Sequence, residues 1–147
     1  MVSELEFFAE PVPPGLGRRF AAIAYDAVLL VAVLFVATAA LLPFSGGEAI
    51  APHNGLYTIY LGVVSFGYFG WFWTHGGQTL GMRSWHLRLA GNGEKGATWG
   101  QAMLRFVSAG LSWLALGAGF LWLLADPERL TWHDRLSGTR IMNARTR

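Results

Sequence analysis

Long apolar runs separated by short polar segments dominate the pattern of this chain. The first run covers residues 20–42 and follows the basic pair Arg18 and Arg19. It is long enough to cross a bilayer, because a membrane helix needs about 20 apolar residues. Its one charged residue is Asp26. A carboxylate inside a membrane helix is costly unless it is protonated, paired or facing water, so Asp26 is a candidate functional residue.

The second run, residues 56–74, predicts another membrane helix with many aromatic residues. Tyr57 lies near one end and the pair Trp71 and Trp73 near the other. Aromatic side chains are enriched at these depths, where a membrane helix meets the headgroups. Small residues such as Gly62 allow a neighbouring helix to approach closely. We interpret these residues as packing groups and not as ligands.

A third hydrophobic segment, residues 100–125, fits two structures. Its first half carries polar residues that recur every three or four positions, at Gln101, Arg105, Ser108 and Ser112. Such spacing places them in one stripe along a helix. The second half is apolar but too short to span. The segment is therefore either one continuous span from about 106 to 125, or an interfacial helix that bends at Gly117 or Gly119 into a re-entrant half-helix.

The basic residues favour the re-entrant structure. Cytoplasmic loops of membrane proteins carry an excess of Lys and Arg. Two crossings plus a re-entrant segment place every basic stretch in the cytoplasm, whereas a third crossing would place the arginine-rich tail, residues 126–147, outside. The N-terminal tail, residues 1–16, is then cytoplasmic as well.

The polar loop, residues 75–98, contains a strand pattern. From Arg83 to Ala90 apolar and polar residues alternate, and a glycine-rich turn follows. The alternation places Trp85, Leu87 and Leu89 on one side and His86 and Arg88 on the other. A lone strand is not stable in water. The tail segment Gly138–Met142 is a candidate partner if both lie on one side of the membrane. The predicted fold class is thus an all-α membrane protein with two transmembrane helices, a third hydrophobic segment and a small cytoplasmic β-hairpin element.

Composition agrees with a multi-pass membrane protein. Hydrophobic residues make up 53% of the chain and charged residues 14%, which is unlike a soluble domain. The net charge of +2 comes from basic residues beside apolar runs, so it indicates membrane orientation and no nucleic-acid partner. The acidic N-terminus and the long first run do not resemble a cleavable signal peptide, so we expect the first span to remain in the mature protein.

No catalytic motif is recognisable, so we predict that the protein is not an enzyme and needs no cofactor. The four histidines stand in separate segments without metal-ligand spacing, at His53, His75, His86 and His133. We therefore predict no metal site. The absence of cysteine excludes disulfides.

Four segments in order resemble the RDD family of small bacterial membrane proteins. They are RRFAAIAYDAVLL from Arg18, GQTLGMRSWHLRL from Gly77, QAMLRF from Gln101 and WHDRLSGTRIM from Trp132. The family is named for an arginine and two aspartates, which correspond by position to Arg19, Asp26 and Asp134. Met82 departs from the family, which often has a lysine there. The resemblance implies a membrane domain over residues 17–147 and a location in the bacterial inner membrane.

The ionisable residues of these segments form our site hypothesis. Arg19 and Asp26 are seven residues apart, too far along one helix for a direct ion pair. We expect them to join Arg105 and Asp134 in one charged cluster at the cytoplasmic end of the bundle. Asp26 would bind a proton or Na⁺ and the arginines would supply the competing charge. In the alternative, the same residues form a static network that holds the tail against the first helix.

His133 is a secondary candidate. Beside Asp134 it would serve as a proton relay. Such a pair also commonly caps a turn, and Asp134 is itself placed to be a helix N-cap.

Two functions follow from this hypothesis and from the resemblance, which implies transport and, for some members, cation/proton antiport. The first is a small transporter that exchanges monovalent cations for H⁺. The alternative is a non-transporting scaffold or assembly protein whose charged cluster is structural. The expected partners are the lipid bilayer with its anionic headgroups, H⁺ and monovalent cations, and either further copies of the chain or another membrane protein.

Overall fold

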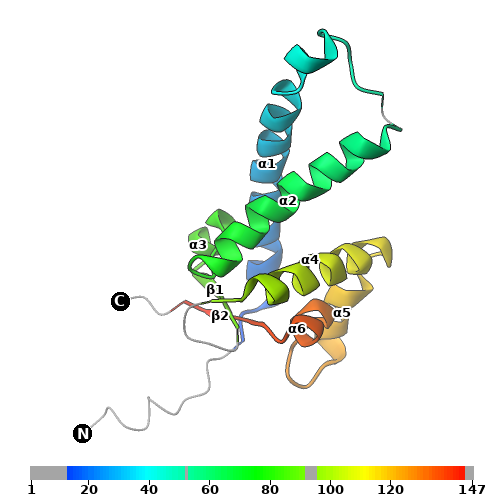
Figure 1. The fold of residues 1–147 in the computed structure, drawn as a ribbon. Helices are drawn as coiled ribbons and strands as arrows, with labels where there is room; N and C mark the ends of the chain where they lie inside the picture. The colour runs from blue at the N-terminus through cyan, green and yellow to red at the C-terminus, as the bar shows by residue number, and fades with distance from the viewer. Residues whose placement is uncertain (1–12, 52, 92–95, 145–147) are drawn as a thin grey trace, which may run out of the picture.

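The computed structural model describes residues 13–51, 53–91 and 96–144, and most of them are helical (Figure 1). The predicted N-terminal tail lies mainly outside these ranges. The helices are α1 (Leu16–Ala39), the 3-10 turn η1 (Leu42–Ser45), α2 (Gly55–Thr74), α3 (Leu80–Ser84), α4 (Trp99–Leu114), α5 (Ala118–Ala125) and α6 (Trp132–Ser137). The strands are β1 (Leu87–Ala90) and β2 (Arg140–Asn143).

The two long helices, α1 and α2, extend away from the other elements and are joined at their far ends through η1 (Figure 1). Helix α1 ends at Ala39, earlier than predicted, because Pro43 already belongs to the separate turn η1. Two tyrosines of α2 bridge the helices near this end. The hydroxyl of Tyr57 lies 2.8 Å from that of Thr38, and Tyr60 donates to the carbonyl of Ala37 at 3.0 Å. Polar side chains thus link α1 and α2 near their far ends.

Among the described helices, α1 is long and apolar enough to cross a membrane, and the pair α4 and α5 also qualifies if it is one span. Helix α2 has 20 residues, a sufficient length. Its tyrosines, tryptophans and glycines lower its hydropathy, so composition alone does not identify it as a span.

The third hydrophobic segment is bent, so the continuous helix from 106 to 125 is wrong. The axes of α4 and α5 meet at 95°. Leu116 and Gly117 adopt positive φ angles of 56° and 77°, which end α4 and reverse the chain. Gly119 then lies so close to α4 that an added Cβ would stand 2.3 Å from the Ser112 hydroxyl. The predicted bend at Gly117 is confirmed.

Helix α4 is amphipathic, but its polar side is buried and its apolar side is exposed, which is the reverse of a helix in a soluble protein. Its buried side includes Arg105, Ser108 and Ser112. Its large exposed side chains include Leu104, Val107, Leu111 and Leu114. In α1 likewise, Arg19 and Asp26 are buried while Val31 and Phe35 are exposed. Exposed apolar and buried polar side chains are expected where the surroundings are lipid, because every polar group must then be satisfied inside the protein.

The strands β1 and β2 form an antiparallel sheet in which Leu87 faces Asn143 and Ala90 faces Arg140. The predicted pairing of the loop strand with the tail is therefore confirmed. The strands come from distant segments, so they form a two-stranded sheet and not a hairpin. The strand is also shorter than predicted, because Arg83 and Ser84 belong to α3. Leu87 and Leu89 are both buried, whereas Trp85, which was predicted on their side, is exposed because it caps the end of α3 and does not belong to β1.

The segment GQTLG, from Gly77, shapes the approach of α3 and β1 to α1. The carbonyl of Gly77 accepts from the Leu89 N–H at 2.6 Å, and Gln78 donates to the carbonyl of Leu87 at 2.7 Å. A Cβ on Gly81 would stand 2.3 Å from the carbonyl oxygen of Ala22. Glycine is therefore required at position 81 for α3 to pack directly on the backbone of α1.

We predict that Gly81→Ala destabilises the protein by about 1–3 kcal/mol, because the new methyl group forces α3 away from α1. Thermal unfolding in detergent measures the loss. Gly67→Ala is the matched control, since a Cβ at Gly67 meets nothing within 4 Å. Equal melting temperatures for Gly81→Ala and the wild type would refute the close packing.

Candidate functional site

Asp134 lies in the first turn of α6, where a capping box fixes its orientation. The Thr131 side chain accepts from the Asp134 N–H at 3.3 Å, and the Asp134 carboxylate accepts from the Thr131 N–H at 3.1 Å. Thr131 is thus the N-cap and Asp134 the third helical residue, so the prediction that Asp134 is the N-cap is wrong. A pattern of Thr, two residues and an acid does signal a capping box in a sequence.

Two arginines from other helices bind the Asp134 carboxylate. Arg105 of α4 lies 2.5 Å from one oxygen, and Arg19 of α1 lies 3.2 Å from the other. Both guanidinium side chains are 4% exposed and the carboxylate is fully buried. Arg105 also donates to the Thr139 hydroxyl at 2.9 Å and lies over the Trp73 ring. We call Arg19, Arg105, Asp134 and Thr139 the Asp134 network; it joins α1, α4, α6 and the short connection between α6 and β2.

The charges of the network keep Asp134 ionised. Burial alone would raise the pKa of this carboxyl, but the positive charge of Arg105, its hydrogen bond and the charge of Arg19 lower the pKa from 3.8 to about 2. A buried ion pair of this kind is costly to break, because removing one partner leaves an uncompensated charge in a low dielectric. The geometry therefore suits a permanent structural connection.

His133 lies against the network without joining it. Its ring is buried and packs edge-on against Phe120, with 4.7 Å between the ring centroids. Its Nδ1 has no hydrogen-bond partner among the described residues. Burial, followed by the charge of Arg105, lowers its pKa from 6.5 to about 3. His133 is thus neutral at physiological pH.

Asp26 lies apart from this network, although all four predicted residues were expected in one cluster. Its carboxylate accepts from the Thr79 hydroxyl, from the Gly81 N–H at 2.9 Å and from the Tyr68 hydroxyl at 3.5 Å. We call these four residues the Asp26 site. The structure thus brings Arg19, Arg105 and Asp134 together and gives Asp26 neutral donors from α2 and from the start of α3.

The donors of the Asp26 site were not predicted from the sequence. Thr79 is recognisable afterwards as the N-cap of α3, because its side chain accepts from the Met82 N–H at 3.1 Å. The donation from Thr79 to Asp26 links residues 53 positions apart. Tyr68 is one of many aromatic residues in α2, and no local pattern distinguishes it. Within the described ranges, no three His, Cys, Asp or Glu side chains gather as a metal site.

We predict that Asp134→Asn lowers the free energy of unfolding by about 3–5 kcal/mol, since it leaves two buried arginines without a carboxylate. Chemical unfolding in detergent measures the change. Glu128→Gln is the matched control, because Glu128 is exposed and lies 3.9 Å from its partner Arg140. A loss below about 1 kcal/mol, the range of surface pairs, would contradict a buried network.

The lowered pKa of His133 leads us to predict that the stability of the fold depends on pH. Its pKa falls from 6.5 in the unfolded chain to about 3 in the fold, so between these values the unfolded chain binds the extra proton. Stability should therefore decline as pH falls from about 6.5 toward 3, by up to about 1.4 kcal/mol per pH unit. The contribution of Asp134 is lost only below its ordinary pKa of 3.8.

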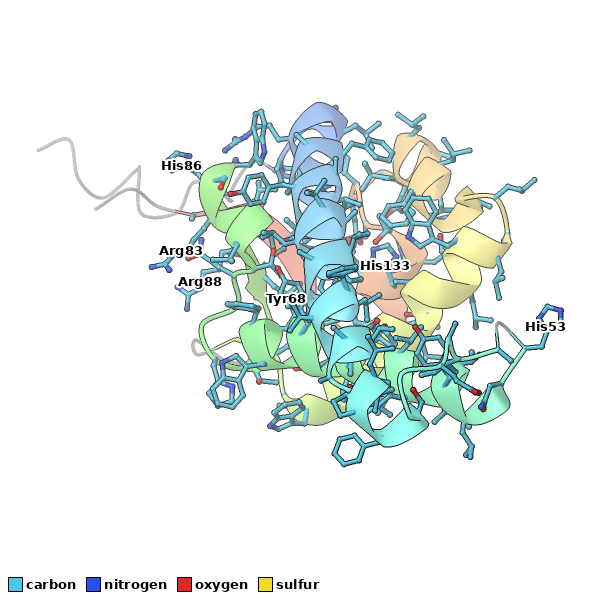
Figure 2. All side chains as sticks on the ribbon, turned by 90° about the horizontal axis from the view of Figure 1, so that it is seen from above. His53, Tyr68, Arg83, His86, Arg88 and His133 are labelled. Carbon is cyan, nitrogen blue, oxygen red and sulfur yellow. The ribbon has the colours of Figure 1, made fainter. Side chains whose placement is uncertain are left out.

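Melting curves of the wild type and His133→Gln between pH 7.5 and 4.5 test this expectation. The variant should show a flatter decline. His53→Gln is the control, because His53 is exposed in the α1–α2 connection, whereas His133 lies among the helices (Figure 2). An unchanged slope in His133→Gln would show that His133 is not the group that titrates.

Comparisons with known proteins identify the family. No curated protein and no solved structure matches the chain. The model described as the RDD family matches residues 13–138. This match covers most of the chain and contains the Asp26 site together with Arg19, Arg105 and Asp134. The chain therefore belongs to the RDD family of membrane proteins.

Proposed function

We propose that this RDD protein exchanges protons for a monovalent cation across the bacterial inner membrane, with Asp26 as the coupling group. The observation that carries the proposal is the surroundings of Asp26. This carboxylate is buried within α1, the described helix that by itself is long and apolar enough to cross a membrane, and its donors among the described residues are neutral. A carboxylate in such a position is stable when it binds a proton or a cation.

The two acids differ in the charge of their partners. Asp134 is balanced by two arginines and stays ionised. Asp26 is surrounded instead by the oxygen atoms of Tyr68 and Thr79. Hard cations bind to oxygen ligands, so a desolvated Na⁺ or K⁺ and a proton would compete for the same carboxylate. The cation and the proton thus compete directly for Asp26. Arg19 and Arg105 do not supply the competing charge, because both bind Asp134.

The arrangement of the strands supports two crossings, by α1 and α2, and a re-entrant α4–α5 pair. Strand β1 precedes α4 and β2 follows α6, yet the two are paired. Arg18, at the start of α1, donates to Asn143 of β2 at 2.8 Å. These contacts support our proposal that the three segments share one side of the membrane, and the positive-inside rule favours the cytoplasmic side. A full crossing by α4 and α5 would separate β1 from β2.

Assembly with other membrane helices is the second candidate function. Helix α2 has Gly62 and Gly67 on its exposed surface, and a Cβ at either would meet nothing within 4 Å. Ile59 and Val63 are exposed on the same helix. Exposed small residues let a second helix approach closely in lipid. In this candidate function Asp26 only anchors α3 to α1.

Reconstituted protein distinguishes the two functions. Liposomes containing a pH-sensitive dye receive inward gradients of Na⁺, K⁺ or Li⁺, and dye fluorescence reports proton movement. We predict cation-dependent proton movement in the wild type and its loss in Asp26→Asn, because the amide cannot exchange a proton for a cation. The control Glu48→Gln removes an acid from the α1–α2 connection and should remain active.

Folding is measured on the same preparations. Loss of activity in an Asp26→Asn variant with wild-type insertion and melting temperature supports coupling at Asp26. Loss of both activity and folding supports the anchoring role. Absence of cation-dependent proton movement in the wild type would refute the antiport proposal and favour assembly.

A further inference from the structure

The corner between α3 and β1 presents basic side chains at its surface. Arg83 and His86 are exposed, and Figure 2 shows both on the same edge of the molecule as Arg88. Trp85 is also exposed, between them in the sequence. His86 has a positive φ of 53°, which turns the chain sharply from α3 into β1. We call Arg18, Arg83, Trp85, His86 and Arg88 the corner patch.

Arg18 connects the corner patch to the start of the first membrane helix. Its guanidinium donates to the carbonyl of Trp85 and to the side chain of Asn143. Arg18 lies in the first turn of α1, immediately before the apolar part of that helix. The patch therefore lies at the depth where α1 enters the bilayer, which is the headgroup layer.

No described acidic residue pairs with Arg83, which carries the argument for the patch. Asp26 and Asp134 are buried in the sites described above, and Asp126 binds Arg135. Glu128 lies near Arg140, and Glu48 is in the connection at the other end of α1. Arg83 in particular makes no ion pair or hydrogen bond with its side chain in the described part of the chain. Its charge is available to an external anion.

We propose that the corner patch binds the headgroup phosphate of an anionic phospholipid in the leaflet where α1 begins. Arginine suits this ligand, because its planar guanidinium can bind two phosphate oxygens at once. Trp85 supplies an amphipathic ring of the kind that resides among headgroups. Basic residues close to a membrane surface attract anionic lipid. The lipid would hold α3, and with it the Asp26 site, at a constant depth.

Thermal unfolding in mixed micelles tests the proposal. The full-length protein in maltoside detergent receives dioleoyl phosphatidylglycerol or, for comparison, dioleoyl phosphatidylcholine. We expect phosphatidylglycerol to raise the wild-type Tm by about 3 °C more than phosphatidylcholine does. Arg83→Gln should lose at least half of this difference, and Arg83→Lys should retain more of it than Arg83→Gln. Because the attraction is electrostatic, high salt should reduce the difference.

Arg140→Gln is the matched control, since Arg140 is an exposed arginine on β2 next to Glu128. It should retain the full difference between the two lipids. A full difference in Arg83→Gln, or an equal effect of both lipids on the wild type, would overturn the proposal. An equal shift with soluble glycerol phosphate would also overturn it, because the ligand would then be a free anion. Asp26→Asn should keep the lipid effect, so this test is independent of antiport.

Discussion

The carboxylate of Asp134 holds the helices α1, α4 and α6 together. It lies between Arg19 and Arg105, so one acidic group connects α1, α4 and α6. All three charged side chains are buried, so removing one would leave an uncompensated charge in a low dielectric. The buried residues of α6 are His133, Asp134 and Ser137, and all three are polar. Charged and hydrogen-bonded contacts therefore carry the specificity of the assembly.

The second acid performs the corresponding task for α3. Asp26 accepts from Thr79 and from the Gly81 N–H, and Gly81 permits direct contact with the backbone at Ala22. The two acids thus attach different elements to α1, with α6 held at Arg19 and α3 held at Asp26. They differ in charge balance, because the partners of Asp26 in the described ranges are neutral. This difference is the basis for proposing Asp26, and not Asp134, as the coupling group.

Buried polar and exposed apolar side chains explain why α4 and α5 form a bent pair instead of a straight helix. Ser112 packs against Gly119 across the bend, while Leu111 and Leu114 are exposed. The bend turns the chain through 95°, and the segment after α5 then reaches β1, with which β2 pairs. The sheet and the Asp134 network both bring the segment after α5 against elements that precede it in the chain.

Local patterns in the sequence were sufficient to determine the main elements. The apolar runs predicted the long helices, alternation predicted a strand that includes β1, and the spacing of polar residues predicted the single polar stripe of α4. Each is a periodicity of a single segment, and hydrophobic burial or lipid exposure acts on it directly. The bend at Gly117 was also expected from glycine in a short apolar stretch, although a straight span fitted the same composition.

Only the tertiary structure decided how the charged residues are grouped. Arg19 and Asp26 share a helix, and their spacing excluded a mutual ion pair without indicating where each partner lies. The partners come from segments 53 and 115 residues away, so their identity depends on how the elements pack. Thr79 and Tyr68 are neutral, and charge patterning could not reveal them. The separation of Asp26 from Asp134 therefore follows from helix packing, because α6 binds α1 at Arg19 and α3 binds it at Asp26, about two turns further along the helix.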